Sequence, residues 1–320
     1  MAFRIVGTGS CPGDHVVTNL DLAGIVETSE EWIRTRTGIG SRYLTTGAGT
    51  SDMAAQAAKR ACENGRVRPE ELDLILMATS TPENCFPCGA CEVQGRIGAV
   101  NAAAFDISAA CSGFLFALQT ANCFLSSGVF RKILVIGADD LSKITDWEDR
   151  ETCILFGDGA GAVVVQEEKE GFFHGVMRAD GSRGHVLTCT ARSGGNFLTQ
   201  RTPAFGYTSM DGREVFRFAV REVPECIKQL LERQGIQTEE IRYYVLHQAN
   251  ERIIEAVARR LGEPMDKFPM NIQKYGNTSA ATIPILLDEM NQAGQLKRGD
   301  KVVLAGFGGG LTWGAAVLEW

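Results

Sequence analysis

The sequence of 320 residues predicts an α/β fold made of two similar halves, on three observations. Apolar strand patterns alternate with amphipathic helical patterns, as in layered α/β proteins with mainly parallel sheets. Two strand patterns recur after 169 residues: Glu71–Ala78 returns as Glu240–His247, and Lys132–Gly137 returns as Lys301–Gly306. Each half also closes with a glycine-rich turn and a strand. We therefore expect a pseudo-twofold pair of βαβ units.

The chain opens with a strand that runs from Met1 into a glycine turn at Gly7, without the long apolar core or cleavage site of an export signal. Amphipathic patterns predict helices at residues 52–64, 113–126, 213–234, 251–261 and 282–293. The glycine-rich turns at Gly157 and Gly308 lead into strands that we expect to form hairpins with the strands before them.

Composition and charge exclude several classes of protein. With 44% hydrophobic and 22% charged residues, the chain has the composition of a globular protein rather than a disordered one. Its 32 lysines and arginines against 39 aspartates and glutamates give a net charge of −7, which argues against a nucleic-acid partner. The longest apolar runs fall far short of the roughly 20 residues of a membrane span. We expect no nucleic-acid or membrane partner and a cytoplasmic location.

The cysteine pattern predicts thiols rather than a metal site. Ten cysteines in a long chain without an export signal are expected to be mostly buried thiols. The run Cys85-x-x-Cys88-x-x-Cys91 resembles part of an iron–sulfur ligand set, but no fourth ligand follows at short spacing. The residues after it read as an ordinary helix. We therefore predict no metal.

The glycine loops do not predict a nucleotide cofactor. In Gly7-x-Gly9, Pro12 stands where the third glycine of a dinucleotide fingerprint belongs. The loops that begin at Gly157 and Gly306 lead into strands, not into a helix N-terminus that would hold a pyrophosphate. Glycine does allow close backbone approach, so these loops suit a backbone N–H that faces a ligand.

The best candidate nucleophile is Cys111. It belongs to a stretch from Ala103 that reads as a strand, a tight turn of small residues and then a helix. A cysteine at a helix N-terminus lies near free N–H groups and the positive end of the helix dipole, which both favour the thiolate. The alternative is that Cys111 is simply a small buried side chain.

His247 and Asn277 complete a candidate site. His247 ends a strand, where open α/β sheets place ligands, and Asn277 lies in a tight turn before a helix. Taken singly, the alternatives are a structural histidine and a helix cap. The repeat matches Cys111 to residue 280, three residues from Asn277, so both occupy the same corner of their halves. A thiol, an imidazole and an amide in one pocket suit acyl transfer with two donors on an enolate oxygen.

Taken together, these motifs resemble the β-ketoacyl-acyl carrier protein synthase III family of the thiolase superfold over nearly the full length. The matching stretches are Glu31–Ile39, Ala109–Phe114, Phe156–Ala162, His247–Asn250, Gly276–Ala280 and Phe307–Gly310. Sister families carry a second histidine, a second cysteine or a glutamate where this chain has Asn277. The resemblance implies a layered α-β-α-β-α fold with pseudo-twofold related halves. Residues 1–170 would carry the nucleophile, and residues 171–320 the histidine and asparagine.

The resemblance also implies the reaction. Cys111 takes a short acyl group, acetyl as the first choice, from acyl-CoA. The acyl-enzyme then condenses with malonyl-acyl carrier protein as carbon dioxide is lost, which gives a 3-ketoacyl carrier protein. Backbone N–H groups of Cys111 and Gly309 form the oxyanion hole, and His247 and Asn277 stabilise the enolate. The enzyme would thus be an acyltransferase that initiates type II fatty acid synthesis, with CoA thioesters as substrates and no cofactor.

Further site residues follow from the same resemblance. Those for CoA are Thr28, Trp32, Arg36, Arg150, Gly212 and Asn250. Those for the carrier protein are Arg217, Arg252 and Arg259, with a solvated basic face as the alternative. The acyl pocket is expected to be lined by Phe86, Leu141, Phe156 and Leu187. Phe86 matches a residue that crosses a twofold interface, so a homodimer is expected, with a plain core position as the alternative.

Two other functions stay open at this point. A related synthase of secondary metabolism would use the same three residues with a CoA-bound or other acceptor. A degenerate thioester-binding subunit would need fewer of them. The preferred primer chain is not predicted, because residues from distant segments line the acyl pocket.

Overall fold

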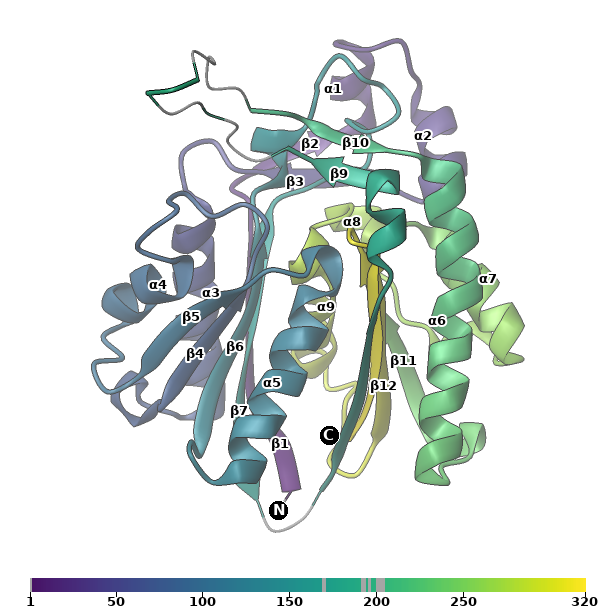
Figure 1. Cartoon of the computed structure of the whole chain (residues 1–320). Helices are drawn as coiled ribbons and strands as arrows, with labels where there is room; N and C mark the ends of the chain where they lie inside the picture. The colour runs from purple at the N-terminus through teal and green to yellow at the C-terminus, as the bar shows by residue number, and fades with distance from the viewer. Residues whose placement is uncertain (1, 169–170, 191–193, 195–196, 200–204) are drawn as a thin grey trace.

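The computed structural model describes residues 2–168, 171–190, 194, 197–199 and 205–320. The two larger of four β-sheets in these residues form the two halves, with helices between them and further helices on both outer faces (Figure 1). The layers therefore follow the order α-β-α-β-α that the resemblance implies. The expected boundary at residue 170 lies outside the described residues.

The first sheet has the order β1-β7-β6-β4-β5. Its strands are β1 (Ala2–Pro12), β7 (Gly159–Glu168), β6 (Lys132–Asp139), β4 (Leu74–Ala78) and β5 (Ala103–Ile107). Strand β4 pairs in parallel with β5 and β6, whereas β7 pairs antiparallel with β6 and β1. The central strands β4 and β6 are buried and mostly aliphatic, as strands covered on both faces are.

The second sheet has the order β11-β12-β13-β8 and repeats the first without its fifth strand. Its strands are β11 (Ile241–Leu246), β12 (Lys301–Gly308), β13 (Thr312–Glu319) and β8 (Phe173–Ala179). Only β11 and β12 pair in parallel. The prediction of mainly parallel sheets is therefore wrong. Both sheets are mixed, because the last strand of each half, β7 or β13, runs antiparallel to the strand before it.

Helices cover both faces of each sheet (Figure 1). The outer ones are α3 (Thr50–Gly65), α4 (Gly89–Ile97), α6 (Gly212–Gln234) and α7 (Glu251–Leu261), and the inner ones are α5 (Gly113–Ser127) and α9 (Thr282–Gln292). Phe114 of α5 and Ile283 of α9 share one core cluster with Val135 of β6 and Leu304 of β12. Burying each such side chain contributes roughly 1.5–3 kcal/mol, so this shared core joins the two halves.

Gly7 and Gly9 serve packing and not nucleotide binding. A Cβ on Gly7 would lie 2.2 Å from the carbonyl oxygen of Ala61, and one on Gly9 would lie 2.4 Å from that of Ala57. Both contacts are with α3, so β1 approaches this helix more closely than any side chain would allow. The rejection of a dinucleotide fingerprint agrees with this arrangement.

The 169-residue repeat extends to the backbone. The short 3-10 helix η2 (Ala110–Ser112) precedes α5, and its counterpart η7 (Ser279–Ala281) precedes α9. Both begin with a left-handed residue, with φ of 48° at Ala110 and 52° at Ser279. Residues with a side chain adopt this conformation at a cost of roughly 1–2 kcal/mol, so its recurrence indicates one corner built twice.

The remaining elements lie mainly near the carboxyl ends of the central strands (Figure 1). The strands and helices there are β2 (His15–Thr18), α1 (Asn19–Ala23), α2 (Glu30–Thr37), β3 (Ser41–Leu44), β9 (Leu187–Cys189), β10 (Thr208–Met210) and α8 (Ile272–Tyr275). Other 3-10 turns span Pro69–Glu71, Leu141–Ile144, Gly181–Val186, Thr238–Glu240 and Met265–Lys267. Among the described residues, no helix has the length and apolar character needed to cross a membrane.

Candidate active site

A cavity of about 2060 Å³ is lined by residues of both halves. Its lining includes Cys111 after β5, His247 after β11 and Asn277 before α9. The loop before β7 meets this corner of the second half, because Phe156 and Asn277 form an isolated β-bridge. The three candidate side chains, which come from distant parts of the sequence, therefore share one space.

Cys111 lies in η2 directly before α5, and its side chain is partly exposed. Enclosure by its neighbours raises the pKa of the Cys111 thiol to about 12, although a hydrogen bond with the Ser279 side chain lowers it. The negative charge of Asp139 raises it further. Burial therefore favours the protonated thiol, against the expectation of a thiolate at this helix N-terminus.

His247 is buried, and its backbone N–H donates to the carbonyl of Ala305 at 2.8 Å. Its ring packs edge-on against Phe307, with 5.5 Å between the ring centroids. Nδ1 lies 2.7 Å from Oγ1 of Thr282, which leaves Nε2 as the ring nitrogen available to a substrate. Burial lowers the pKa of His247 to about 3, so the ring is neutral near pH 7.

The Asn277 amide is oriented by its own turn. Its Oδ1 accepts the backbone N–H of Ser279 at 2.9 Å, so Nδ2 is the free end of the amide and can only donate. Its backbone N–H donates to Leu155 at 2.9 Å. The fully buried Arg42 braces the same loop by donating to the carbonyl of Ile154 at 2.7 Å.

The turn between β12 and β13 packs against η2. A Cβ on Gly308 would lie 2.6 Å from the backbone nitrogen of Cys111, and one on Gly309 would lie 3.6 Å from Cβ of Ala110. Only glycine at position 308 allows the turn to come this close. The backbones of Cys111 and Gly309 both line the cavity, as an oxyanion hole made from their N–H groups requires.

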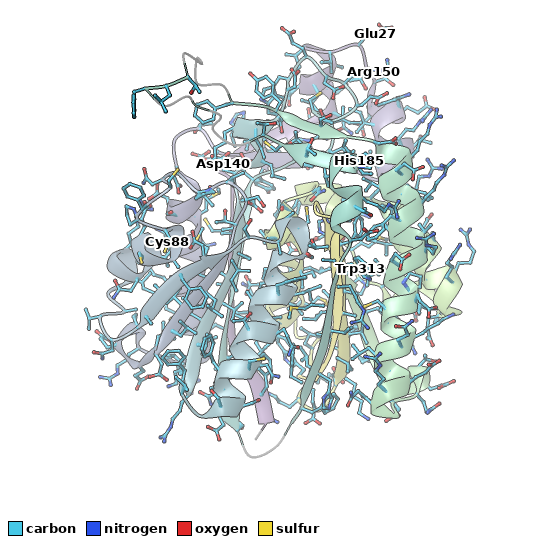
Figure 2. The ribbon with its side chains drawn as sticks, viewed as in Figure 1. Glu27, Cys88, Asp140, Arg150, His185 and Trp313 are labelled. Carbon is cyan, nitrogen blue, oxygen red and sulfur yellow. The ribbon has the colours of Figure 1, made fainter. Side chains whose placement is uncertain are left out.

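Trp32 lines the cavity, and two guanidinium groups lie close to its ring. The Cζ atoms of Arg36 and Arg150 are 5.3 Å and 4.9 Å from the centroid of its ring. Arg150 donates to the carbonyl of Glu27 at 3.0 Å, and Figure 2 draws these two residues near one another. The predicted CoA residues that line the cavity are Trp32, Arg36, Gly212 and Asn250. Thr28 and Arg150 lie outside its lining.

Most of the residues predicted for the carrier protein and the acyl pocket also line the cavity. Arg217 and Arg252 are exposed and line the cavity, whereas Arg259 is exposed on α7 outside the lining. Arg217 is 2.6 Å from Glu214, and such an exposed pair contributes little to stability.

All four predicted acyl-pocket residues line the cavity: Phe86, Leu141, Phe156 and Leu187. Phe86 is 87% exposed, which excludes the alternative of a core position.

Three residues beside the site are not predicted from the sequence as site residues: Asp139, Ser279 and Thr282. Asp139 is fully buried and accepts the backbone N–H of Ser80 at 2.7 Å. One signal was available for it, since it is an acidic residue at the end of an otherwise apolar strand pattern. Thr282 has no such signal, because a threonine that opens a helix is ordinary.

The cysteine cluster lies at the start of α4, where Figure 2 labels Cys88. The sulfur atoms of Cys88 and Cys91 are 3.4 Å apart, and Cys85 is exposed. Within the described part of the chain, no three or more His, Cys, Asp or Glu side chains are grouped as metal ligands.

Two duplicated α/β halves with a thiol at the corner between them define a condensing acyltransferase of the thiolase-like fold class. The family model described as 3-oxoacyl-[acyl-carrier-protein (ACP)] synthase III matches residues 105–181, and the model for its C terminal matches residues 231–320. The beta-ketoacyl-[acyl-carrier-protein] synthase III of Clostridium acetobutylicum is 51% identical over 99% of this chain and 98% of its own length.

Solved structures agree with the sequence matches. The 3-oxoacyl-[acyl-carrier-protein] synthase III from Aquifex aeolicus is 47% identical with a TM-score of 0.93, over 100% of both chains. The priming β-ketosynthase from the R1128 polyketide pathway is 34% identical with a TM-score of 0.92, over 99% of this chain and 96% of that one. This chain belongs to the β-ketoacyl-[acyl-carrier-protein] synthase III family and is a condensing enzyme that initiates fatty acid synthesis.

Proposed function

We propose that the chain loads a short acyl group, acetyl as the first choice, from acyl-CoA onto Cys111. It then condenses this group with malonyl-acyl carrier protein and releases CoA, carbon dioxide and 3-ketoacyl-acyl carrier protein. The observation that carries the proposal is the one cavity shared by Cys111, His247 and Asn277. The thiol serves as the acyl acceptor, and the imidazole and amide serve as donors to the enolate oxygen.

In the loading step, the Cys111 sulfur attacks the thioester carbon, and its proton ends on the CoA sulfur that leaves. The N–H groups of Cys111 and Gly309 donate to the oxyanion of the tetrahedral intermediate. Loss of one such donor typically lowers kcat by about 10²–10³-fold. The close approach of Gly308 to the Cys111 nitrogen supports this assignment, because it brings Gly309 next to η2, the turn that carries Cys111.

In the condensation step, carbon dioxide leaves malonyl-acyl carrier protein, and the electron pair of the broken C–C bond forms an enolate. The enolate carbon attacks the acyl carbonyl on Cys111, the C–S bond breaks, and the released Cys111 thiolate takes up a proton. The free Nδ2 of Asn277 donates to the enolate oxygen, and so does Nε2–H of His247. Because His247 is neutral, Nε2 carries the ring proton only when Nδ1 accepts a hydrogen bond from the Thr282 hydroxyl. This hydroxyl has one proton and also lies 3.0 Å from the Ser279 carbonyl, so in the condensation step it must donate to Nδ1 instead of to that carbonyl. The Ser279 carbonyl still accepts the Thr282 backbone N–H.

For CoA, the proposed site is the arginine-flanked Trp32 with Thr28, Gly212 and Asn250. An adenine ring would stack on the indole, and the guanidinium groups of Arg36 and Arg150 would bind phosphate. Trp32, Arg36, Gly212 and Asn250 support this site, because all four line the cavity that holds Cys111.

For the acidic carrier protein, the proposed contacts are Arg217, Arg252 and Arg259. All three are exposed, and two of them line the cavity mouth, so a local basic surface exists on a chain of net negative charge. Such surfaces act mainly through association rate and orientation.

We also propose a homodimer and a division into halves at residues 1–170 and 171–320. The exposed Phe86 borders the acyl pocket, and Phe105 on edge strand β5 is 37% exposed. An uncovered edge strand with apolar side chains favours pairing with a second copy. Sedimentation equilibrium on Phe86→Asp tests this; a wild-type chain that stays monomeric at micromolar concentration would contradict the dimer.

The experiment for the proposed function compares two extenders. Enzyme preloaded with acetyl-CoA is mixed with malonyl-acyl carrier protein or with malonyl-CoA, and the ketoacyl product is measured by mass spectrometry. We expect product mainly from the carrier-bound extender. Asn277→Ala should keep loading and lose condensation. Equal rates from both extenders would favour a CoA-bound acceptor instead.

A further inference from the structure

Asp139 is a buried carboxylate where the two halves meet, and the proposed mechanism gives it no role. One oxygen, Oδ1, accepts the Ser80 N–H at 2.7 Å and the hydroxyls of Thr81 and Thr79 at 3.0 and 3.2 Å. The other, Oδ2, accepts the backbone N–H of Ala280 at 3.3 Å, and the Ser279 side chain also bonds to the carboxyl group. Burial raises the pKa of Asp139, and the hydrogen bonds from Ser80 and Ser279 lower it. Both carboxyl oxygens act as acceptors, which suits the ionised carboxylate.

The internal repeat relates the contact between Asp139 and Ala280 to the contact between Gly308 and Cys111 in the other half. Position 139 ends β6 as position 308 ends β12, and Ala280 stands in η7 as Cys111 stands in η2. Each strand end packs against the corner of the other half. In one corner, Gly308 has no side chain to lie over the Cys111 backbone nitrogen. In the other corner, a carboxylate oxygen lies on the equivalent N–H of Ala280.

We propose that Asp139 is a positioning residue whose carboxylate fills the second half's counterpart of the oxyanion hole and thereby fixes the corner that carries Asn277, Ser279 and Thr282. This inference rests on the proposed roles of Cys111 and Asn277. It adds a residue that touches neither the acyl group nor the extender but determines where both donors to the enolate lie.

The contacts lead from this carboxylate to both donors. Ser279 is held in a left-handed conformation, which needs support from outside the turn. Its N–H bonds to Oδ1 of Asn277, and its carbonyl accepts from Thr282, whose hydroxyl contacts His247. Weakening the hold of Asp139 on this turn should therefore displace the amide and the imidazole together.

The charge of Asp139 acts on the nucleophile in the opposite direction. Its negative charge raises the pKa of the Cys111 thiol, and the ring of His247, which lines the same cavity, is neutral. Removing the charge should therefore make the thiol easier to ionise. A residue with only a structural role would slow both reactions of the site, or neither.

The test uses full-length Asp139→Asn with Asp288→Asn as the matched control. Asp288 is also buried and accepts hydroxyl hydrogen bonds from Thr8 at 2.7 Å and Ser10 at 2.6 Å, but these partners belong to β1 and not to the turn that carries Asn277 and Ser279. Three quantities are measured per folded molecule: the rate of decarboxylative condensation, the rate of acyl loading, and the rate of Cys111 alkylation by iodoacetamide between pH 6 and 9.

For Asp139→Asn we expect condensation to fall at least about tenfold more than loading, which corresponds to roughly 1.4 kcal/mol. We also expect faster alkylation of Cys111 at each pH, whereas Asp288→Asn should match the wild type in both respects. An unchanged ratio of the condensation rate to the loading rate, or an unchanged rate of Cys111 alkylation, would overturn the proposal.

If Asp139→Asn does not fold, Asp139→Glu keeps the charge but displaces the carboxylate by one methylene group. It should slow condensation with alkylation left as in the wild type, and equal slowing of loading and condensation would overturn the proposal. A wild-type enzyme whose Cys111 takes no acyl group would instead contradict the proposed function, so the two failures are distinguishable.

Discussion

Replacing Gly308 with alanine tests the oxyanion hole most sharply, because this glycine touches the backbone of the nucleophile. The added methyl group would lie 2.6 Å from the Cys111 nitrogen and 3.1 Å from Cβ of Ala110. Ordinary contacts between such atoms are about 3.5 Å or longer, so the turn and η2 must separate by about 1 Å. An oxyanion donor works only within about 2.7–3.1 Å of the oxygen.

The expected loss follows from this displacement. If one donor no longer reaches the oxyanion, loading should slow by about 10²–10³-fold. Overpacking costs about 1–3 kcal/mol of stability, which is less than the roughly 5–15 kcal/mol of a typical domain, so the variant should still fold. The effect should therefore appear as a lower rate constant in folded enzyme.

The assay is rapid mixing with acetyl-CoA, followed by intact-mass measurement of the acyl-enzyme. Gly314→Ala is the matched control, because its methyl group would lie 2.7 Å from the carbonyl of Val176 in the same sheet, outside the cavity lining. It should lose stability to a similar degree and load normally. A Gly308→Ala enzyme that loads within about threefold of the wild type would refute the reasoning.

Three further predictions concern the donors, the carrier protein and the thiol. Thr282→Val, which removes the hydroxyl beside His247 Nδ1, should slow condensation about tenfold or more and spare loading; equal slowing in a single-turnover comparison would contradict the tautomer argument. Arg252→Glu should raise the KM for malonyl-acyl carrier protein about tenfold with little change in acyl-CoA loading, and equal loss in both steps would refute the carrier assignment. Because the pKa of Cys111 is raised to about 12, the thiolate fraction, and with it alkylation of the free enzyme, should rise about tenfold per pH unit from pH 7 to 9, and a plateau in that range would contradict a protonated thiol.

Much of the architecture is predictable because the chain is duplicated. The repeat of Lys132–Gly137 as Lys301–Gly306 identifies β6 and β12, and the structure extends it to η2 and η7. The predicted helices lie close to their observed bounds, since each has a clear amphipathic pattern. Strand direction in the outer parts of the sheets is not predictable in the same way, because a glycine-rich turn does not reveal what its strand pairs with on the far side.

The residues of the candidate site can be predicted from the sequence, but the surroundings that set their pKa values cannot. Sequence position marks Cys111, His247 and Asn277 as strand-to-helix corners, and all three do line one cavity. The protonated state of Cys111 is not predictable, because enclosure comes from segments far apart in the sequence. Asp139 is missed for the same reason, since its partners Ser80 and Ala280 belong to different halves.

The most direct measurement of the central claim is peptide mass spectrometry of enzyme incubated with acetyl-CoA, before and after malonyl-acyl carrier protein is added. The acetyl group should be found on Cys111 alone and should disappear when the extender arrives, with Cys88→Ser behaving as the wild type and Cys111→Ser taking no label. An acetyl group on another cysteine, or one on Cys111 that the extender does not remove, would contradict the account.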